Sequence, residues 1–370
     1  MKKLVCVAFL SAISFLACTA QQNSEKLLRL LQSKQVISAK EADSLIAIEN
    51  QIVPSKTFFM VDKVKVFGYA HIGYQNSDTT SLNNTYGVKC IFAIIDAKIS
   101  KTMGFMIQSN VGPVPTLYEY YFEWTPQTYL RIKAGQMKVP LSMENLMSRS
   151  TVENITGSQT INNLVGGATD ILGPVCGGGR DVGIQLAGSL LSYQKRYLLE
   201  YQVGVFNGNG INNLDNNNHK DVAGWLLLNA TSKLKICTSI YVGEGLYKSK
   251  DLGDVNPTNH IRNRWAIGAE MDTKSIFGRV EYLHGKDGIL EKQGIYGLFI
   301  AHLPQKIDLL GEVDTFDKNI TAGNKKFTNY QVGINWNFFK RSRLQLHYVY
   351  RDNNFGRTEN QIMSQLQIGF

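Results

Sequence analysis

The sequence has few cysteines and prolines, and neither kind is arranged as a structural framework. Two of the five cysteines lie within the first 20 residues, and Cys90, Cys176 and Cys237 form an odd, widely spaced set. Such a set fits neither a disulfide scaffold nor a metal site. Only 8 of the 370 residues are proline, and no Pro-rich, Ser-rich or long charged linker divides the chain after residue 60. We therefore expect one continuous unit there, with the three cysteines as small apolar filler.

Long hydrophobic runs are also missing. Hydrophobic residues make up 44% of the chain and the mean hydropathy is −0.15, so a helical membrane protein is excluded. The run Leu4–Ala17 is too short to span a bilayer, follows Lys2 and Lys3, and leads into small residues. This layout predicts a secretory signal peptide over residues 1–20. Lipid modification at Cys18 is the alternative, although the preceding Phe-Leu-Ala suits it poorly, and either way the chain is exported.

Motifs for catalysis, metal binding and nucleotide binding are lacking as well. The six histidines form no close pair, and the glycine-rich stretches "GGGRD" and "NGNG" are not followed by the Lys-Ser or Lys-Thr of a phosphate loop. No basic cluster carries interleaved aromatic residues, which argues against a nucleic-acid partner. The net charge of +9 suggests anionic partners only modestly. We expect no enzyme, no metal and no cofactor.

What the sequence does contain is alternation with a period of two, from Lys63 to the C-terminal Phe370. The alternating segments have the length of tilted membrane strands, and about sixteen can be counted. They cover residues 63–75, 86–99, 103–112, 117–124, 128–138, 181–190, 195–206, 222–232, 233–246, 261–272, 275–285, 293–303, 306–317, 327–338, 343–352 and 360–370.

The connections between these segments fall into two classes that alternate along the chain. One class is tight, as in "SKT", "TPQ" and "DTKS", whereas the other is mostly long and polar, as in "NGNGINNLDNNNHKD" and "YKSKDLGDVNPTNH". Short turns at one end and long loops at the other are typical of an outer-membrane β-barrel. The longest connection, residues 139–180, exceeds ordinary loop length and is apolar enough to pack. We expect it to fold into the barrel and narrow it.

The two faces of each segment differ in the way a water-filled barrel requires. In 343–352, leucines and tyrosines alternate with Arg343, Gln345, His347 and Arg351. The apolar face should meet lipid and the polar face should meet water inside the barrel. Because an unpaired strand edge is costly in lipid, the last strand should pair with the first.

Residues 21–60 have a different pattern, with leucines at helical spacing and Ser38 followed three residues later by Glu41. Ser38 and Glu41 form a capping-box signature. We expect a short helical segment in the periplasm, with a simple spacer as the alternative.

Several stretches together resemble the phosphate-selective porin O and P family. They are "RIKAGQMKVPLSMENL" (131–146), "GGRDVGIQLAG" (178–188), "YQVGVFNGNGINNLDNNN" (201–218), "GRVEYLHG" (278–285) and the terminal Phe370. The resemblance covers roughly residues 60–370. It implies a sixteen-stranded trimeric pore, a constricting third surface loop, anion selectivity from lumen cations, and recognition of Phe370 by the barrel-assembly machinery. Acidic residues assigned to the lumen, among them Glu281 and Asp314, argue against strict phosphate selectivity.

The sequence thus predicts an all-β fold: a transmembrane antiparallel barrel over residues 61–370 in the outer membrane of a Gram-negative cell, contacting its lipid. The predicted function is passive diffusion of small anionic solutes, phosphate among them. A non-conducting barrel for adhesion or anchoring is the alternative. The candidate pore-lining and anion-binding cations are Arg131, Lys133, Lys138, Arg180, Arg262, Arg264, Arg343 and Arg351.

Overall fold

The computed structural model describes residues 63–78, 84–167, 169–171, 178–249, 252–323 and 325–370, and seven residues between 32 and 44. The expected signal peptide, most of the expected helical segment and Cys176 lie outside the described residues. Ser38 and Glu41 are described, and they form the predicted capping box: the Glu41 N–H donates to Ser38 Oγ at 3.2 Å, and the Ser38 N–H donates to the Glu41 carboxylate at 2.8 Å. None of the described helices is long and apolar enough to cross a membrane.

Residues 61–370 form one compact unit built on a single antiparallel sheet. Its strands are β1 (Lys63–Ser77), β2 (Thr85–Lys98), β3 (Met103–Asn110), β4 (Thr116–Gln127), β5 (Leu130–Lys138), β6 (Arg180–Tyr193), β7 (Arg196–Phe206), β8 (Asp221–Leu228), β9 (Leu234–Val242), β10 (Glu244–Tyr247), β11 (Thr258–Asp272), β12 (Ile276–Asp287), β13 (Leu290–Leu303), β14 (Ile307–Asp317), β15 (Lys326–Phe339), β16 (Ser342–Asn353) and β17 (Glu359–Gly369). One 3₁₀ turn, η2 (Pro304–Lys306), joins β13 to β14.

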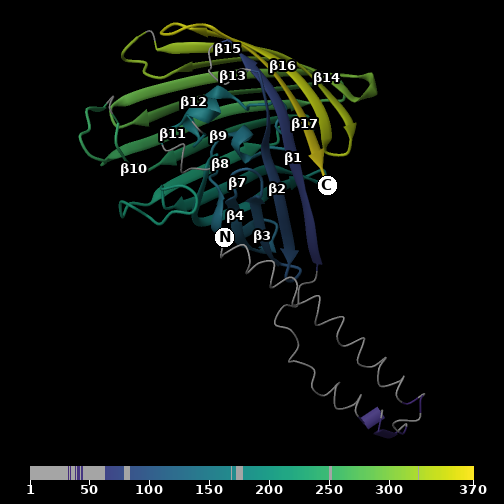
Figure 1. Ribbon diagram of the computed structural model, residues 1–370. Helices are drawn as coiled ribbons and strands as arrows, with labels where there is room; N and C mark the ends of the chain where they lie inside the picture. The colour runs from purple at the N-terminus through teal and green to yellow at the C-terminus, as the bar shows by residue number, and fades with distance from the viewer. Residues whose placement is uncertain are drawn as a thin grey trace. The chain divides into compact units, whose positions relative to one another are not determined.

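The sheet closes on itself as a barrel of sixteen strands. Its described residues contain 17 strand segments, but β9 and β10 are two parts of one strand, since they pair with consecutive stretches of β11 on either side of Gly243. Each strand pairs with its neighbour in sequence, and β1 pairs with β17 (Figure 1). The predicted strand number and the predicted pairing of the last strand with the first are therefore confirmed.

The closing seam continues to the end of the chain. Gly68 and Phe370 exchange both backbone hydrogen bonds, each at 3.0 Å. A side chain at position 68 would collide with this arrangement, because a Cβ there would lie 2.6 Å from Cζ of the Phe370 ring. Glycine at 68 therefore lets the terminal ring cover the seam.

The two faces of the wall have the predicted polarity. On β15, Val332 and Ile334 point outward and are 59% and 48% exposed, whereas Gln331 and Asn335 point inward and are 4% and 2% exposed. The same alternation holds on β16, where Leu344 and Leu346 are exposed and Gln345 and His347 are buried. An apolar outer surface and a polar interior are what a bilayer outside and water inside demand.

The connection between β5 and β6 enters the barrel. We call residues 139–179 the inserted segment; 139–167, 169–171 and 178–179 of it are described. It contains two short helices, α3 (Met143–Leu146) and α4 (Gln159–Leu164). Helix α4 packs against β12, β13 and β14, which places it against the inner face of that wall.

Candidate functional site

Helix α3 is fixed to the wall by one carboxylate of β12. Ser142 caps the helix, since its Oγ accepts from the Asn145 N–H. Glu281 accepts from Ser142 Oγ at 2.8 Å and also from the backbone N–H groups of Met143 and Glu144. The first N–H groups of a helix have no partner within the helix. Here the buried carboxylate of Glu281, on strand β12, accepts hydrogen bonds from these N–H groups.

Helix α4 repeats this arrangement on β14. Ser158 caps the helix by accepting from the Ile161 N–H. Asp314 accepts from Ser158 Oγ at 2.8 Å, from Thr160 Oγ1 at 2.7 Å, and from the backbone N–H groups of Gln159 and Thr160. The sequence assigned Glu281 and Asp314 to the water-filled lumen. Both carboxylates instead accept hydrogen bonds from the inserted segment.

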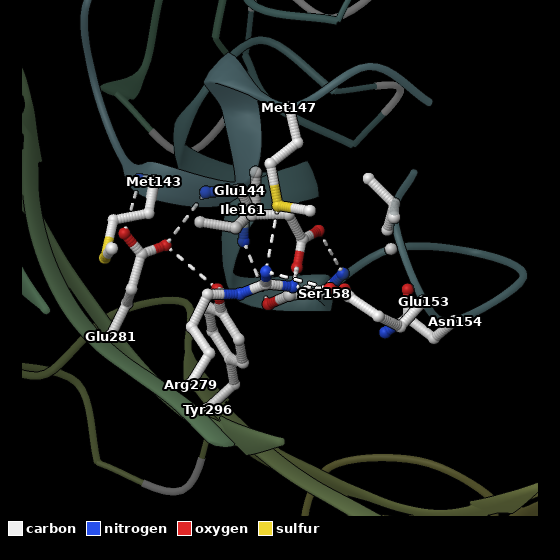
Figure 2. A network of polar contacts seen from close by, with 12 residues as sticks. Met143, Glu144, Met147, Glu153, Asn154, Ser158, Ile161, Arg279, Glu281 and Tyr296 are labelled. Atoms are coloured by element: carbon white, nitrogen blue, oxygen red, sulfur yellow. Dashed lines mark hydrogen bonds and ion pairs between the residues drawn. The ribbon is translucent and has the colours of Figure 1, made fainter. Parts of the chain in front are cut away.

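An arginine of β12 connects the wall to helix α3 and to the stretch between the two helices (Figure 2). Arg279 donates to the Glu153 carboxylate at 2.6 Å and to the Tyr296 hydroxyl at 3.0 Å, and its guanidinium lies 3.6 Å from Glu144. The Tyr296 hydroxyl in turn donates to Glu281. Because Arg279 is buried, with 2% of its surface exposed, these charges form one desolvated network whose members depend on each other.

Glu144 is a member of this network whose carboxyl has a raised pKa. Burial raises the pKa of Glu144 to about 7, against the opposing effects of the Arg279 guanidinium and the Ser158 N–H. The charged groups that face it are Arg279, Glu153, Glu281, Glu312 and Lys138. The attachment of the inserted segment therefore contains a group that titrates near neutral pH.

The rest of the inserted segment is bonded along the same wall. Wall side chains that donate to its backbone carbonyls or pair with its side chains are Arg262 and Arg264 on β11, Glu312 on β14, Asn335 on β15, Arg343 and Gln345 on β16, and Gln367 on β17. The Ser142 N–H also donates to Ser239 Oγ on β9, so the segment lies against the wall from β9 to β17.

A cavity of about 490 Å³ lies on the other side of the inserted segment. We call it the lumen cavity. It is lined by side chains of β1 to β7 together with Leu146 and Ser148 of the inserted segment. Its charged lining residues are Asp96, Glu119, Glu123, Lys133, Lys138 and Arg180. Because most contacts of the inserted segment are with the wall from β9 to β17, the segment narrows the barrel without filling it.

Of the cations predicted on strands β5 and β6, Lys133, Lys138 and Arg180 line this cavity and Arg131 does not, and most of the four have an acidic partner. Arg131 and Lys133 both approach Glu123, at 4.0 and 3.7 Å. Arg180 is buried and donates through Nε and Nη2 to Glu119, at 2.8 and 2.7 Å. Lys138 donates to the backbone carbonyls of Asn145 and Met147. These pairs offset much of the positive charge that the sequence placed in the lumen.

The other predicted cations lie outside the lining of that cavity. Arg262 and Arg264 pair with Asp170, and Arg264 also with Asp287. Arg343 donates to the Val152 carbonyl. These three arginines hold the inserted segment. Arg351, near the end of β16, pairs with Glu359, the first residue of β17, at 3.3 Å.

The sequence patterns revealed neither the acidic partners of the predicted cations nor one further cation of the wall, Lys89. The contact of Arg180 with Glu119 joins residues 61 positions apart, so only the strand register shows it. Lys89 lies at a β-bulge, which interrupts the two-residue period on which the prediction was based. Arg149, in the inserted segment, is also absent from the predicted cations. Among the described residues, no three His, Cys, Asp or Glu side chains are grouped to hold a metal ion.

Solved structures of outer-membrane barrels resemble this one. OmpT, an outer membrane protein of Vibrio cholerae, has a TM-score of 0.62 at 10% identity, covering 83% of this chain and 99% of that chain. The anion-selective porin from Comamonas acidovorans has a TM-score of 0.60 at 12% identity, covering 83% and 99%. Salmonella typhi OmpF, in a complex with daunomycin, has a TM-score of 0.59 at 11% identity, covering 83% and 98%.

No protein-family model and no curated protein sequence matches the chain. At these low identities the structural likeness establishes the fold, a porin-like β-barrel. Together with the apolar outer surface described above, it indicates a protein of the Gram-negative outer membrane.

Proposed function

We propose that this protein is a diffusion porin, through which small solutes cross the outer membrane passively. The observation that carries the proposal is the one-sided docking of the inserted segment. It is bonded to the wall from β9 to β17 and leaves a cavity of about 490 Å³ along β1 to β7. Barrels of this strand number enclose an aqueous lumen, whereas barrels of about eight strands fill with side chains.

Planar-bilayer recording tests this function directly. Purified protein should insert and give stepwise conductance, and deletion of residues 155–175 should raise the size of each step because it removes α4 from the lumen. A protein that stays silent at all voltages would contradict the proposal. That result would favour the alternative, a barrel used for adhesion or anchoring through its surface loops.

We further propose a modest preference for anions, phosphate among them, because the pairing described above does not neutralise every cation. Arg131 and Lys133 share the single carboxylate of Glu123, and Lys138 donates to backbone carbonyls. The reversal potential across a potassium chloride gradient tests this preference, and a pore that favours potassium would contradict it.

The remaining proposals are a homotrimer, in keeping with the trimer form of the Vibrio cholerae protein, and delivery by the barrel-assembly machinery through Phe370. Cross-linking in membranes tests the first, and deletion of Phe370 tests the second.

A further inference from the structure

A β-bulge in β2 turns an extra lysine toward the inside of the barrel. Along the β1–β2 pair, His71 lies opposite Cys90 but Ile72 lies opposite Val88, so Lys89 is the inserted residue. A bulge re-aims the side chains of the bulged strand. Cys90, next to it, is buried on the inner face, whereas Val88 is exposed on the outer face.

Gly73 on β1 provides the space into which Lys89 extends. A Cβ at position 73 would lie 2.9 Å from Lys89 Cε and 3.5 Å from its Nζ. Ile72, the residue before Gly73, is exposed on the lipid-facing side, 45% of its surface, so Gly73 lies on the inner side. The Lys89 ammonium is therefore held on the inner face of the barrel.

The inserted segment brings an arginine to the same place. Gln367 on β17 donates to the Ser150 carbonyl at 3.1 Å, and its own Oε1 bonds His71 Nε2 at 3.0 Å. Ser150 is thus tied to the strand next to β1. Arg149 precedes it, is exposed, and its charge acts on Lys89, Cys90 and His71. Lys89 and the Arg149 position of the inserted segment therefore both lie near the stretch of β1 from His71 to Gly73.

Among the described residues, Lys89 and Arg149 have neither a carboxylate partner nor a hydrogen-bond acceptor, whereas Lys138 and Arg343, which also lack a carboxylate partner, donate to backbone carbonyls. Within the part of the chain that the structure describes, no ion pair involves Lys89 or Arg149, whereas Lys133, Arg180, Arg264 and others all have carboxylate partners. Two like charges held near each other raise the local positive potential. A confined space of lower dielectric strengthens that potential.

We propose that Lys89 and Arg149 form an oxyanion-binding step in the permeation path, which takes the carboxylate or phosphate group of a small solute. An arginine fork matches two oxygens of one such group, and a lysine ammonium adds a point charge. A multi-oxygen anion can engage both, whereas chloride offers only one centre. The inference rests on the proposed porin function and assigns its selectivity to a pair of residues rather than to the predicted cations of β5 and β6.

Bilayer recordings of Lys89→Gln, Arg149→Gln and the double variant test the assignment. Each single change should lower the anion-to-cation permeability ratio roughly twofold, and the double change should lower it further. Inorganic phosphate added to potassium chloride should reduce the chloride current of the wild-type pore, and the double variant should lose this inhibition. Lys89→Arg keeps the charge and should keep both properties.

Lys233→Gln is the matched control, since it removes the same charge from an exposed turn between β8 and β9 and should change nothing. A double variant that conducts with the wild-type permeability ratio and the wild-type response to phosphate would overturn the oxyanion step while leaving the porin function intact. A wild-type protein that never conducts would overturn both. Conduction by each variant shows in the same recording that it has folded.

Discussion

Asp314 and Ser158 are joined by a hydrogen bond of 2.8 Å between residues 156 positions apart in the chain. The same carboxylate also accepts from the two backbone N–H groups that follow Ser158. A charged acceptor on such donors contributes about 1.5–3 kcal/mol for each bond. Asp314 is therefore a principal attachment of the inserted segment, and Glu281 is its counterpart at α3.

We expect the combined change Asp314→Ala and Glu281→Ala to release the inserted segment from the wall. Mean single-channel conductance should rise toward that of the variant lacking residues 155–175, with larger open-channel noise. Asp308→Asn is the control, because Asp308 also faces inward on β14 but contacts His302 and Asn337 instead. Unchanged conductance in the double variant would mean that other contacts suffice to hold the segment.

Docking should weaken as the pH rises through neutrality. The pKa of Glu144 is about 7 when docked, against an ordinary value of 4.5. Because the raised pKa favours the protonated form, its contribution is fully present below pH 4.5 and is lost as the pH passes 7, up to about 3 kcal/mol. Open-channel noise should therefore be larger at pH 8 than at pH 6. Glu144→Gln should abolish that difference; a variant as pH-sensitive as the wild type would assign the effect to another group.

Charge pairing at the lumen cavity predicts opposite effects from the two partners of one contact. Glu119→Gln removes the carboxylate that Arg180 contacts and should shift the reversal potential toward anions. Arg180→Gln exposes Glu119 to the cavity and should shift it toward cations. The double change should return close to the wild-type value, since neither charge then remains. Shifts of the same sign in both single variants would contradict the pairing.

Gly68 should not tolerate even one added methyl group. A Cβ there would lie 2.1 Å from the Phe92 carbonyl oxygen as well as close to the Phe370 ring, so Gly68→Ala should lower barrel stability by about 1–3 kcal/mol. The unfolding temperature, followed by circular dichroism in detergent, measures this effect. Gly297→Ala on β13 is the control, because a Cβ there meets nothing within 4 Å. Equal unfolding temperatures would show that the seam can adapt.

The sequence was sufficient for the wall of this barrel. Lipid outside and water inside impose opposite polarities on neighbouring residues. The alternation of Leu344 and Gln345 therefore predicts which residue faces lipid and which faces the lumen. The connection over residues 139–180 was also expected to enter the barrel, because of its length and apolar content. The break at Gly243 between β9 and β10 was not predicted, because it interrupts the strand without changing its pairing with β11.

The site was less predictable, because charge pairs depend on register rather than on spacing. Arg131 and Lys133 share a face in any extended strand, but only the pairing of β4 with β5 brings Glu123 opposite Lys133. Lys89 was overlooked for a related reason. The bulge that turns it inward changes the two-residue period locally, so a regular alternation assigns Lys89 to the wrong face.

Attachment of the inserted segment also constrains the order of folding. Its anchors Glu281 and Asp314 follow Ser142 and Ser158 by 139 and 156 residues, and they face inward only when β12 and β14 are paired. Contacts between such distant residues form late, since the chain between them must first be ordered. The constriction therefore depends on the wall, because its anchors are in place only after β12 and β14 have paired.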